Sequence, residues 1–282
     1  MTLRMQIKSD VGKCALCGQI RRLEKSHIIP QGCYSRLRDG APFTVNVVGK
    51  SAFPSQKQLH ARLLCKACEG LFDKHGEKFF FQNCLQNDGS FPVFTKGIEH
   101  ITELVTIDNQ KAGYWPSASL GVPPEKLAYF AASLFWRTWA AKERLPRDRI
   151  SLDLQPEVVE GLRNFLLSRS STIANSALVA NLVGRTPQQS IDLRYVFSLP
   201  QEITRHDMGT AIRFYNTECL GFVFFLISAP EPMLTYARTN CILHNESHPI
   251  FVGEGIQQGS IKRQYAWVGG STPTESLKTW HR

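Results

Sequence analysis

Apolar residues follow a helical period in the middle of the chain and an extended period nearer its end. Helical spacing runs over residues 123–139 and again over 156–167, and each segment opens with proline, whose missing N–H costs no hydrogen bond in a first helical turn. Alternating or short apolar runs predict strands, mostly from about residue 177 onward. The strand candidates are residues 101–107, 191–197, 211–215, 222–227 and 250–252. Because the helices precede most of the strands, the pattern favours an α+β domain over a doubly wound one.

The N-terminal part has a different pattern, of short strands and one helix. Residues 20–24 and 45–48 are strand candidates, and Pro30 is expected to end regular structure where it stands. After Cys68 the apolar residues take up helical spacing over residues 71–79. This change of pattern predicts a separate N-terminal unit of small size.

Four of the eight cysteines form two CxxC pairs, Cys14–Cys17 and Cys65–Cys68. Each pair can present two thiolates to one cation, and two pairs complete the tetrahedral sulfur shell that suits Zn²⁺. The 47 residues between the pairs exceed the spacing of a simple zinc ribbon, so further structure is expected between them. Since a closed shell of four thiolates leaves no open position, the predicted role of the zinc is structural.

Positive charge is concentrated in this cysteine-bearing part of the 282-residue chain. The whole chain has a formal charge of +9, and residues 1–85 hold 14 Lys and Arg against 6 Asp and Glu. We therefore divide the chain into a basic zinc unit, 1–85, and an α+β domain, 86–282. A basic excess on one small module favours contact with nucleic-acid phosphates over a merely solvated surface or cations that neutralise bound thiolates. The candidate contacts are Arg21, Arg22, Lys25, Arg36, Arg38, Arg62 and Lys66.

The remaining features predict a protein of the reducing cytoplasm. The other four cysteines stand apart in apolar surroundings, as buried free thiols do; they are Cys33, Cys84, Cys219 and Cys241. The first ten residues contain no apolar core of signal-peptide length. The most apolar stretch, residues 220–227, is too short to cross a bilayer as a helix, so no membrane partner is expected.

Residues between and after the CxxC pairs could hydrolyse a phosphodiester. A neutral histidine such as His27 can activate water, and Glu69 and Asp73, one helical turn apart, can supply oxygen ligands to Mg²⁺ or Mn²⁺. The alternative is that His27 only forms a hydrogen bond within the zinc fold. In the same way, Glu69, Asp73 and Glu77 can be an ordinary solvated helix face.

The order of these motifs resembles an HNH endonuclease of the ββα-metal type with an added structural zinc. The resemblance covers about the first third of the chain and is carried by the first CxxC pair, His27-Ile28-Ile29-Pro30, and Leu63-Leu64-Cys65 followed by Cys68 and a helix. It implies that His27 is the general base. It also implies that His60, in a slot where the family usually has Asn, orients the base or contacts the phosphate.

Two positions depart from the family pattern. A metal-binding histidine usually follows the second CxxC pair, where this chain has Glu69, and an acidic ligand often precedes the base, where it has Ser26. Glu69 can still bind a divalent cation through oxygen. Together with residues 129–137, the motifs also resemble a group of bacterial HNH-like proteins of unassigned role, which implies no mechanism for residues 86–282.

The sequence therefore predicts a metal-dependent endonuclease with structural Zn²⁺ and catalytic Mg²⁺ or Mn²⁺. Its expected substrate is DNA rather than RNA, and residues 86–282 are expected to meet a protein partner. Related modules recur in restriction, phage defence and mobile elements, so the resemblance implies a defence role by analogy. Two alternatives stay open: a zinc module that binds nucleic acid without cutting it while its second domain docks a partner, and a structural zinc fold that serves protein assembly.

Overall fold

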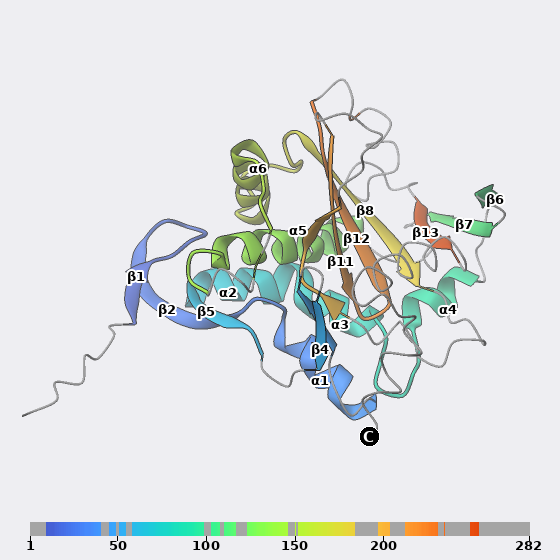
Figure 1. The fold of residues 1–282 in the computed structure, drawn as a ribbon, viewed down its shortest axis with the longest axis horizontal. Helices are drawn as coiled ribbons and strands as arrows, with labels where there is room; N and C mark the ends of the chain where they lie inside the picture. The colour runs from blue at the N-terminus through green and yellow to red at the C-terminus, as the bar shows by residue number, and fades with distance from the viewer. Residues whose placement is uncertain are drawn as a thin grey trace, which may run out of the picture.

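The computed structural model describes residues 10–40, 45–48, 51–54, 58–98, 103–107, 110–116, 123–145, 150, 152–183, 197–203, 212–230, 234 and 249–253. Helices and mostly antiparallel sheets are both present, which confirms the predicted α+β class (Figure 1). The helical elements are α1 (Gln31–Gly40), α2 (Lys66–Phe72), the π-helical turn η1 (Asp73–Glu77), α3 (Lys78–Asn83), α4 (Pro92–Ile98), α5 (Pro124–Ala141) and α6 (Pro156–Leu166). The strands are β1 (Val11–Lys13), β2 (Ile20–His27), β3 (Val45–Val48), β4 (Ser51–Pro54), β5 (His60–Cys65), β6 (Glu103–Ile107), β7 (Gln110–Pro116), β8 (Ser176–Val183), β9 (Phe197–Ser198), β10 (Gln201–Ile203), β11 (Arg213–Cys219), β12 (Phe222–Ser228) and β13 (Pro249–Gly253). No helix in these segments is both long and apolar enough to cross a membrane.

A small antiparallel sheet, ordered β1–β2–β5, lies at one end of the described part, on the left in Figure 1. β5 passes directly into α2, so β2, β5 and α2 form the predicted β–β–α unit. His27 and His60 are partners across β2 and β5. The small sheet therefore places the two predicted catalytic histidines on adjacent strands.

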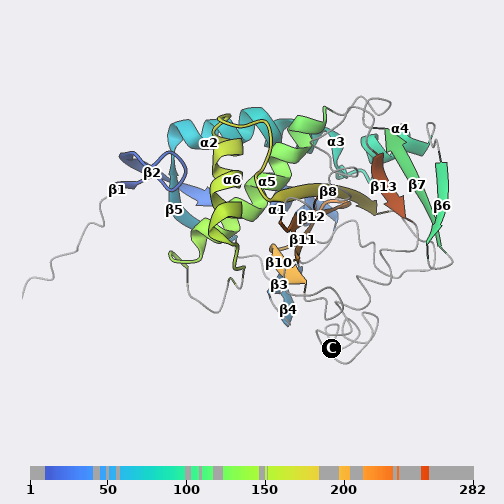
Figure 2. The same cartoon turned by 90° about the horizontal axis from the view of Figure 1, so that it is seen from above.

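α2, η1 and α3 follow one another without a break and form one helical rod over residues 66–83, which runs beside α5 (Figure 2). The π-helical turn in the middle of the rod is a geometry that often marks functional positions. In this turn Gly76 approaches α5 so closely that a Cβ would lie 2.9 Å from the backbone nitrogen of Phe130. Because a larger side chain would push the two helices apart, the close approach requires glycine.

Aromatic side chains fill the space between the rod, α5 and the larger sheet. The Phe80 ring stacks on Phe130 with centroids 3.7 Å apart, and Phe224 of β12 contacts both rings. Phe135 and Trp136 of α5 are also buried. These aromatic residues of α5 are therefore part of the core.

The larger sheet draws strands from both predicted units. Its order is β4–β3–β9–β11–β12–β8–β13–β7–β6, with β10 beside β11, and the β3–β9 and β8–β13 pairs are parallel. β3 and β4 come from the first 85 residues, yet they extend a sheet built mostly from later strands. One cluster of buried residues also runs from Cys14 to Leu234. The division at residue 85 stays a prediction, and both the sheet and the core are continuous across it.

The structure adds one N-terminal helix to the expected elements and lengthens another. Regular structure ends before Pro30, because β2 ends at His27, and α1, for which there was no prediction from the sequence, begins at the residue after Pro30. The helix expected after Cys68 begins two residues earlier, at Lys66, so Cys68 lies within it.

The later strand predictions are mostly confirmed. β6, β12 and β13 overlap the segments predicted at 101–107, 222–227 and 250–252. The strand predicted at 211–215 is β11, which continues to Cys219. The prediction at 191–197 lies outside the described residues, apart from Phe197 at the start of β9.

Glu218 is a buried carboxyl within the larger sheet. It lies on β11 with 6% of its surface exposed, and its backbone N–H donates to the Ser198 hydroxyl at 2.9 Å. Its Oε1 is buried and has no hydrogen-bond partner among the described residues. Burial raises the pKa of this carboxyl from 4.5 to about 7, because the charged form loses its hydration.

We predict that Glu218→Gln flattens the pH dependence of stability between about pH 4.5 and pH 7. A carboxyl whose pKa is raised by folding binds more protons in the folded state, so the free energy of unfolding falls as pH rises through this window. The loss in the wild type is at most about 3 kcal/mol. Urea unfolding of both proteins at about pH 5 and pH 8 measures the difference. The same pH dependence in both proteins would show that Glu218 is not the group responsible.

Candidate metal centre and active site

The four predicted zinc cysteines come together where the small sheet meets the rod. Their sulfur atoms all lie within 4.8 Å of one another. Cys14 and Cys17 flank a tight turn after β1 that continues into Gly18 at φ +77°, and Cys65 and Cys68 span the start of α2. Four sulfur donors in this arrangement can hold one metal ion, and the donor set is compatible with zinc.

Backbone hydrogen bonds hold both cysteine pairs in place. The N–H of Gly18 donates to the Cys14 carbonyl at 2.9 Å and closes the first turn. The N–H of Ala15 donates to the Leu63 carbonyl at 3.0 Å, and the N–H of Cys65 donates to the Cys14 sulfur at 3.4 Å. The two pairs are therefore joined by the fold of the protein itself.

The sulfur cluster favours one thiolate and resists further ionisation until a cation supplies positive charge. A hydrogen bond from the Cys68 thiol lowers the pKa of Cys14 to about 4. The same contact raises the pKa of Cys68, and burial raises the pKa of Cys17. Because neighbouring thiolates repel one another, metal binding is expected to release protons from the remaining thiols.

His27, the predicted general base, lies half-buried at the end of β2 and is held on two sides. Its Nε2 lies 2.8 Å from Oε1 of Gln58, and its backbone carbonyl accepts a hydrogen bond of 3.2 Å from Arg137. Since an amide oxygen can only accept, this contact places the proton on Nε2 and leaves Nδ1 unprotonated in the neutral ring. Burial lowers the pKa of His27 below its ordinary 6.5, so the ring is neutral at pH 7.

Gln58 is a site residue that sequence reasoning did not single out. Its side chain contacts His27, and its backbone carbonyl lies 3.0 Å from Nδ1 of His60. The two imidazole centroids are 6.2 Å apart, and His60 is exposed. The only sequence signal for Gln58 is its place two residues before His60, which does not by itself predict the contact.

Glu69 and Asp73, the predicted ligands of a catalytic cation, lie one turn apart on the rod in different surroundings. Glu69 is half-buried, and within the segments that the structure describes its buried Oε1 has no hydrogen-bond partner. Its negative charge opposes, to a small extent, the lowering of the His27 pKa by burial. Asp73 is exposed. Among the described residues, only one group of at least three His, Cys, Asp or Glu side chains is close enough to share one ion, and it consists of the four cysteines.

Ser26 is used within the small sheet. It is 2% exposed, and its hydroxyl accepts a hydrogen bond of 3.2 Å from the N–H of Leu64. Neighbouring residues of a strand face opposite sides of the sheet, so Ser26 and His27 point away from each other. The position where the resembling family often has an acidic ligand is therefore a packing position in this chain.

Arg137 of α5 joins His27 to the rod. It is 2% exposed, forms an ion pair with Glu77 of η1, and places its guanidinium carbon 4.5 Å from the centre of the Phe72 ring. The sequence treated Glu77 as part of a solvated acidic face, but its side chain is only 19% exposed. The difference arises because α5 packs against this side of the rod, which the spacing within one helix does not reveal.

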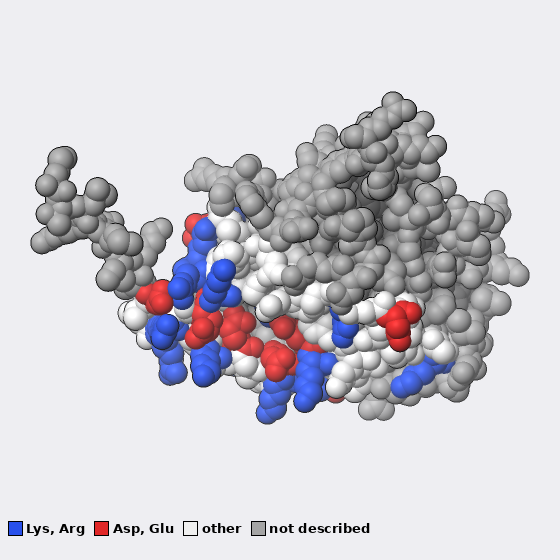
Figure 3. Space-filling view, turned by 90° about the horizontal axis from the view of Figure 1, so that it is seen from below, with Lys and Arg blue, Asp and Glu red and all other residues white. Residues whose placement is uncertain are grey.

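The predicted nucleic-acid contacts on β2 and α2 lie at the surface. Arg21, Lys25 and Lys66 are exposed, and Arg22 is exposed with one guanidinium nitrogen 3.7 Å from Asp10. Figure 3 shows Lys and Arg side chains gathered at the end that carries the small sheet, with Asp and Glu side chains between them. This surface therefore carries both charges, and its Lys and Arg side chains lie at the end of the molecule that carries the small sheet (Figure 3).

Other predicted contacts take part in internal interactions. Arg62 forms an ion pair of 2.7 Å with Asp10 and donates to a backbone carbonyl of β2. Arg36 donates to the Phe81 carbonyl and lies 5.3 Å from the centre of the Phe81 ring. The side chain of Arg38 lies outside the described residues. Part of the positive charge counted in the sequence is thus already engaged within the protein.

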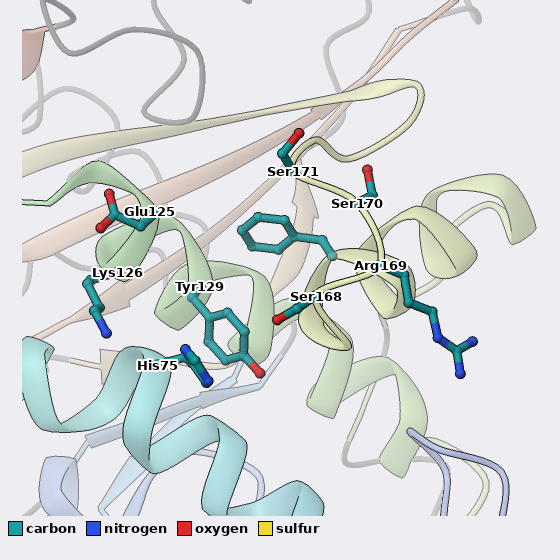
Figure 4. Close-up of a pocket in the computed structure, with 9 residues that line it drawn as sticks. His75, Glu125, Lys126, Tyr129, Ser168, Arg169, Ser170 and Ser171 are labelled. Carbon is teal, nitrogen blue, oxygen red and sulfur yellow. The ribbon is translucent and has the colours of Figure 1, made fainter.

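A cavity of about 480 Å³ lies between η1, the start of α5 and the loop after α6 (Figure 4). Its lining includes His75, Lys126, Tyr129 and Arg169. The Tyr129 hydroxyl donates to the Leu166 carbonyl at 2.7 Å, and Arg169 points away from His75 in Figure 4. Because its polar groups do not converge on one point, this cavity defines no ligand position.

Comparison of the chain with protein-family models, with curated proteins and with solved structures found no match. The resemblance to HNH endonucleases therefore stays a prediction carried by the motifs. Any functional proposal depends on the geometry around His27 and the four cysteines.

We predict that the purified protein holds about one tightly bound metal ion per chain, as one shell of four thiols requires. Cys14→Ser should lose most of this metal and lower the melting temperature, since metal binding stabilises the fold that forms the shell. Elemental analysis gives the metal content. Cys84→Ser, which changes a buried thiol outside the cluster, is the matched control and should keep the metal. Equal metal content in the two variants would contradict the assignment.

Proposed function

We propose that this protein is a metal-dependent endonuclease that hydrolyses phosphodiester bonds of DNA. The observation that carries the proposal is the setting of His27, a neutral imidazole whose ring contacts Gln58 and whose backbone carbonyl contacts Arg137. Glu69 adds a buried carboxyl oxygen that has no hydrogen-bond partner among the described residues. The β–β–α arrangement around it and the motif resemblance support the same activity.

In the proposed reaction, Nδ1 of His27 takes a proton from a water molecule as that water attacks the phosphorus atom. The bond from phosphorus to the leaving oxygen breaks, and the leaving oxygen takes up a proton from solvent. Gln58 and Arg137 hold the ring and its backbone, so His27 needs little reorientation during the reaction. In this proposal His60, which is exposed on the adjacent strand, contacts a phosphate oxygen.

A divalent cation, Mg²⁺ or Mn²⁺, supplies stabilisation of the charge on the leaving oxygen when it is bound. Glu69 fits the role of ligand because no described residue forms a hydrogen bond with its buried Oε1. Mg²⁺ usually keeps several waters and binds through one or two carboxylates, so a site with few protein ligands is sufficient. In the four-cysteine site the proposed ion is Zn²⁺, which clamps β1 to the start of α2 and takes no part in the chemistry.

The exposed cations of β2 and α2 support binding to nucleic acid. Arg21, Lys25 and Lys66 can contact phosphates, and such contacts position a strand without reading its sequence. We propose DNA over RNA as the substrate. A role in bacterial defence and a cytoplasmic location belong to the same proposal and follow by analogy.

A zinc module that binds nucleic acid without cutting it is the second candidate function. Two observations favour it. Asp73 is exposed, and in the described segments His27, His60 and Glu69 do not belong to any group of three or more side chains close enough to share a metal ion. Under this alternative, residues 86–282 would dock a protein partner.

We predict that His27→Ala lowers cleavage of plasmid DNA by about 10²–10⁴-fold in Mg²⁺ or Mn²⁺ while affinity changes little. The lost proton acceptor acts mainly in the transition state, so the rate falls and binding does not. Nicking assays and binding titrations measure the two effects, and unchanged metal content shows that the variant is folded. Cleavage that survives the change would place the base elsewhere, with His60 the next residue to test.

Glu69→Gln tests the cation in the same assay. It keeps the side-chain shape and removes the charge, so activity should fall and partly return at high Mg²⁺ or Mn²⁺ concentration. Glu157→Gln, an exposed carboxylate on α6, is the matched control and should cleave like the wild type. Wild-type protein that binds DNA but cuts neither DNA nor RNA with any of several divalent metals would support the binding-module alternative.

Replacing Arg21, Arg22 and Lys25 together by Ala should weaken binding to all DNA sequences alike and reduce its salt dependence. Each phosphate contact that is lost removes one released counterion, so the slope of log affinity against log salt should fall by about one for each contact. Titrations at several salt concentrations measure the slope. Replacing Lys96, Lys142 and Arg169 removes the same charge elsewhere, and an equal effect of both triple variants would reject the assigned surface.

A further inference from the structure

Cys33 and Cys219 form a second thiol pair, separate from the four-cysteine site. Their sulfur atoms lie 3.1 Å apart, and the residues are 0% and 2% exposed. Cys33 belongs to α1 and Cys219 ends β11, so the pair joins positions 186 residues apart in the chain. The separation is about 1 Å longer than a disulfide bond of about 2.05 Å.

The surroundings of this pair favour oxidation over metal binding. Cys84 is a third buried thiol, and the adjacent Leu85 donates its N–H to the Leu220 carbonyl at 3.3 Å, next to Cys219. Within the described residues, however, no third ligand atom joins Cys33 and Cys219 as a metal site. Structural metal sites need about four protein ligands, so two thiols are better suited to form a bond with each other.

We propose that Cys33 and Cys219 are an oxidisable dithiol that closes to a disulfide and links α1 to β11. The oxidant is a peroxide. The sulfur of one cysteine attacks a peroxide oxygen, the O–O bond breaks, and a sulfenic acid and one water form. The sulfur of the other cysteine then attacks the sulfenic sulfur, and a second water leaves. Two thiols and one hydrogen peroxide thus give one disulfide and two waters, with two electrons passing from sulfur to oxygen.

Burial sets the conditions under which the pair reacts. Burial raises the pKa of Cys33, and the thiolate is the reactive form, so the folded protein reacts slowly. A reducing environment therefore keeps both thiols, and closure requires sustained exposure to oxidant. Once the first sulfur is oxidised, its partner is already in contact, which makes disulfide formation faster than further oxidation.

The bond would replace a thiol–thiol contact between α1 and β11 by a covalent link. α1 begins four residues after His27, so the link would tie the end of β2 to the larger sheet. Closing so long a loop restricts the unfolded chain, and the melting temperature should rise by about 10 °C. This effect does not depend on the proposed nuclease activity.

Peptide mapping of the full-length protein tests the proposal. Metal-loaded protein is treated with hydrogen peroxide for graded times, blocked with N-ethylmaleimide, unfolded and digested with trypsin. Cys33 then lies on residues 26–36, Cys219 on 214–238 and Cys84 on 79–96. We expect peptides 26–36 and 214–238 to be joined, Cys84 to be alkylated, and the rise in melting temperature to disappear on reduction with dithiothreitol.

Matched variants separate this link from oxidation elsewhere. Cys33→Ala should abolish the joined peptides and the rise in melting temperature, whereas Cys84→Ala should keep both. The proposal is overturned if Cys33 and Cys219 are recovered as separately alkylated peptides after peroxide has already released the metal from the four-cysteine site. Recovery of Cys33 joined to Cys84 overturns it equally. Mapping of the wild type decides the question even if Cys33→Ala does not fold.

Discussion

The packing of α5 against the rod of α2, η1 and α3 is the contact on which the other parts of the structure depend. Gly76 allows the two helices to approach, and the stacked rings of Phe80 and Phe130 continue the contact toward β12. The rod begins in the four-cysteine site and ends at the larger sheet. One pair of packed helices therefore sets the position of the small sheet relative to the larger one.

Arg137 extends this packing into the candidate active site. A buried guanidinium is costly unless its charge and its N–H groups find partners. Glu77 supplies the charge, the Phe72 ring supplies a cation–π contact, and the His27 carbonyl accepts a hydrogen bond. The orientation of His27 thus depends on α5, an element outside the first 85 residues. The motif-bearing part of the chain does not build its site alone.

The four-cysteine site and the Cys33–Cys219 pair differ in burial and therefore in chemistry. In the four-cysteine site Cys17 is half-exposed and four sulfur atoms are close enough to bind one cation. A metal ion from solution can therefore neutralise the negative charge of the thiolates. Cys33 and Cys219 are closed off from solvent, and the described residues bring no further ligand atom to them, so metal binding is not favoured there. Burial also raises the pKa of Cys33. The basic residues show a similar division, since Asp10 engages Arg62 while Lys25 stays exposed.

The sequence by itself determined the α+β class, the main helices and strands, and the grouping of the two CxxC pairs, because periodicity, proline placement and ligand spacing are properties of neighbouring residues. Only the tertiary structure decided the contact of Gln58 with His27, the pairing of Glu77 with Arg137, and the meeting of Cys33 with Cys219. Each of these contacts joins residues far apart in the chain. The depressed pKa of His27 likewise comes from desolvation by packed elements, which no local pattern encodes.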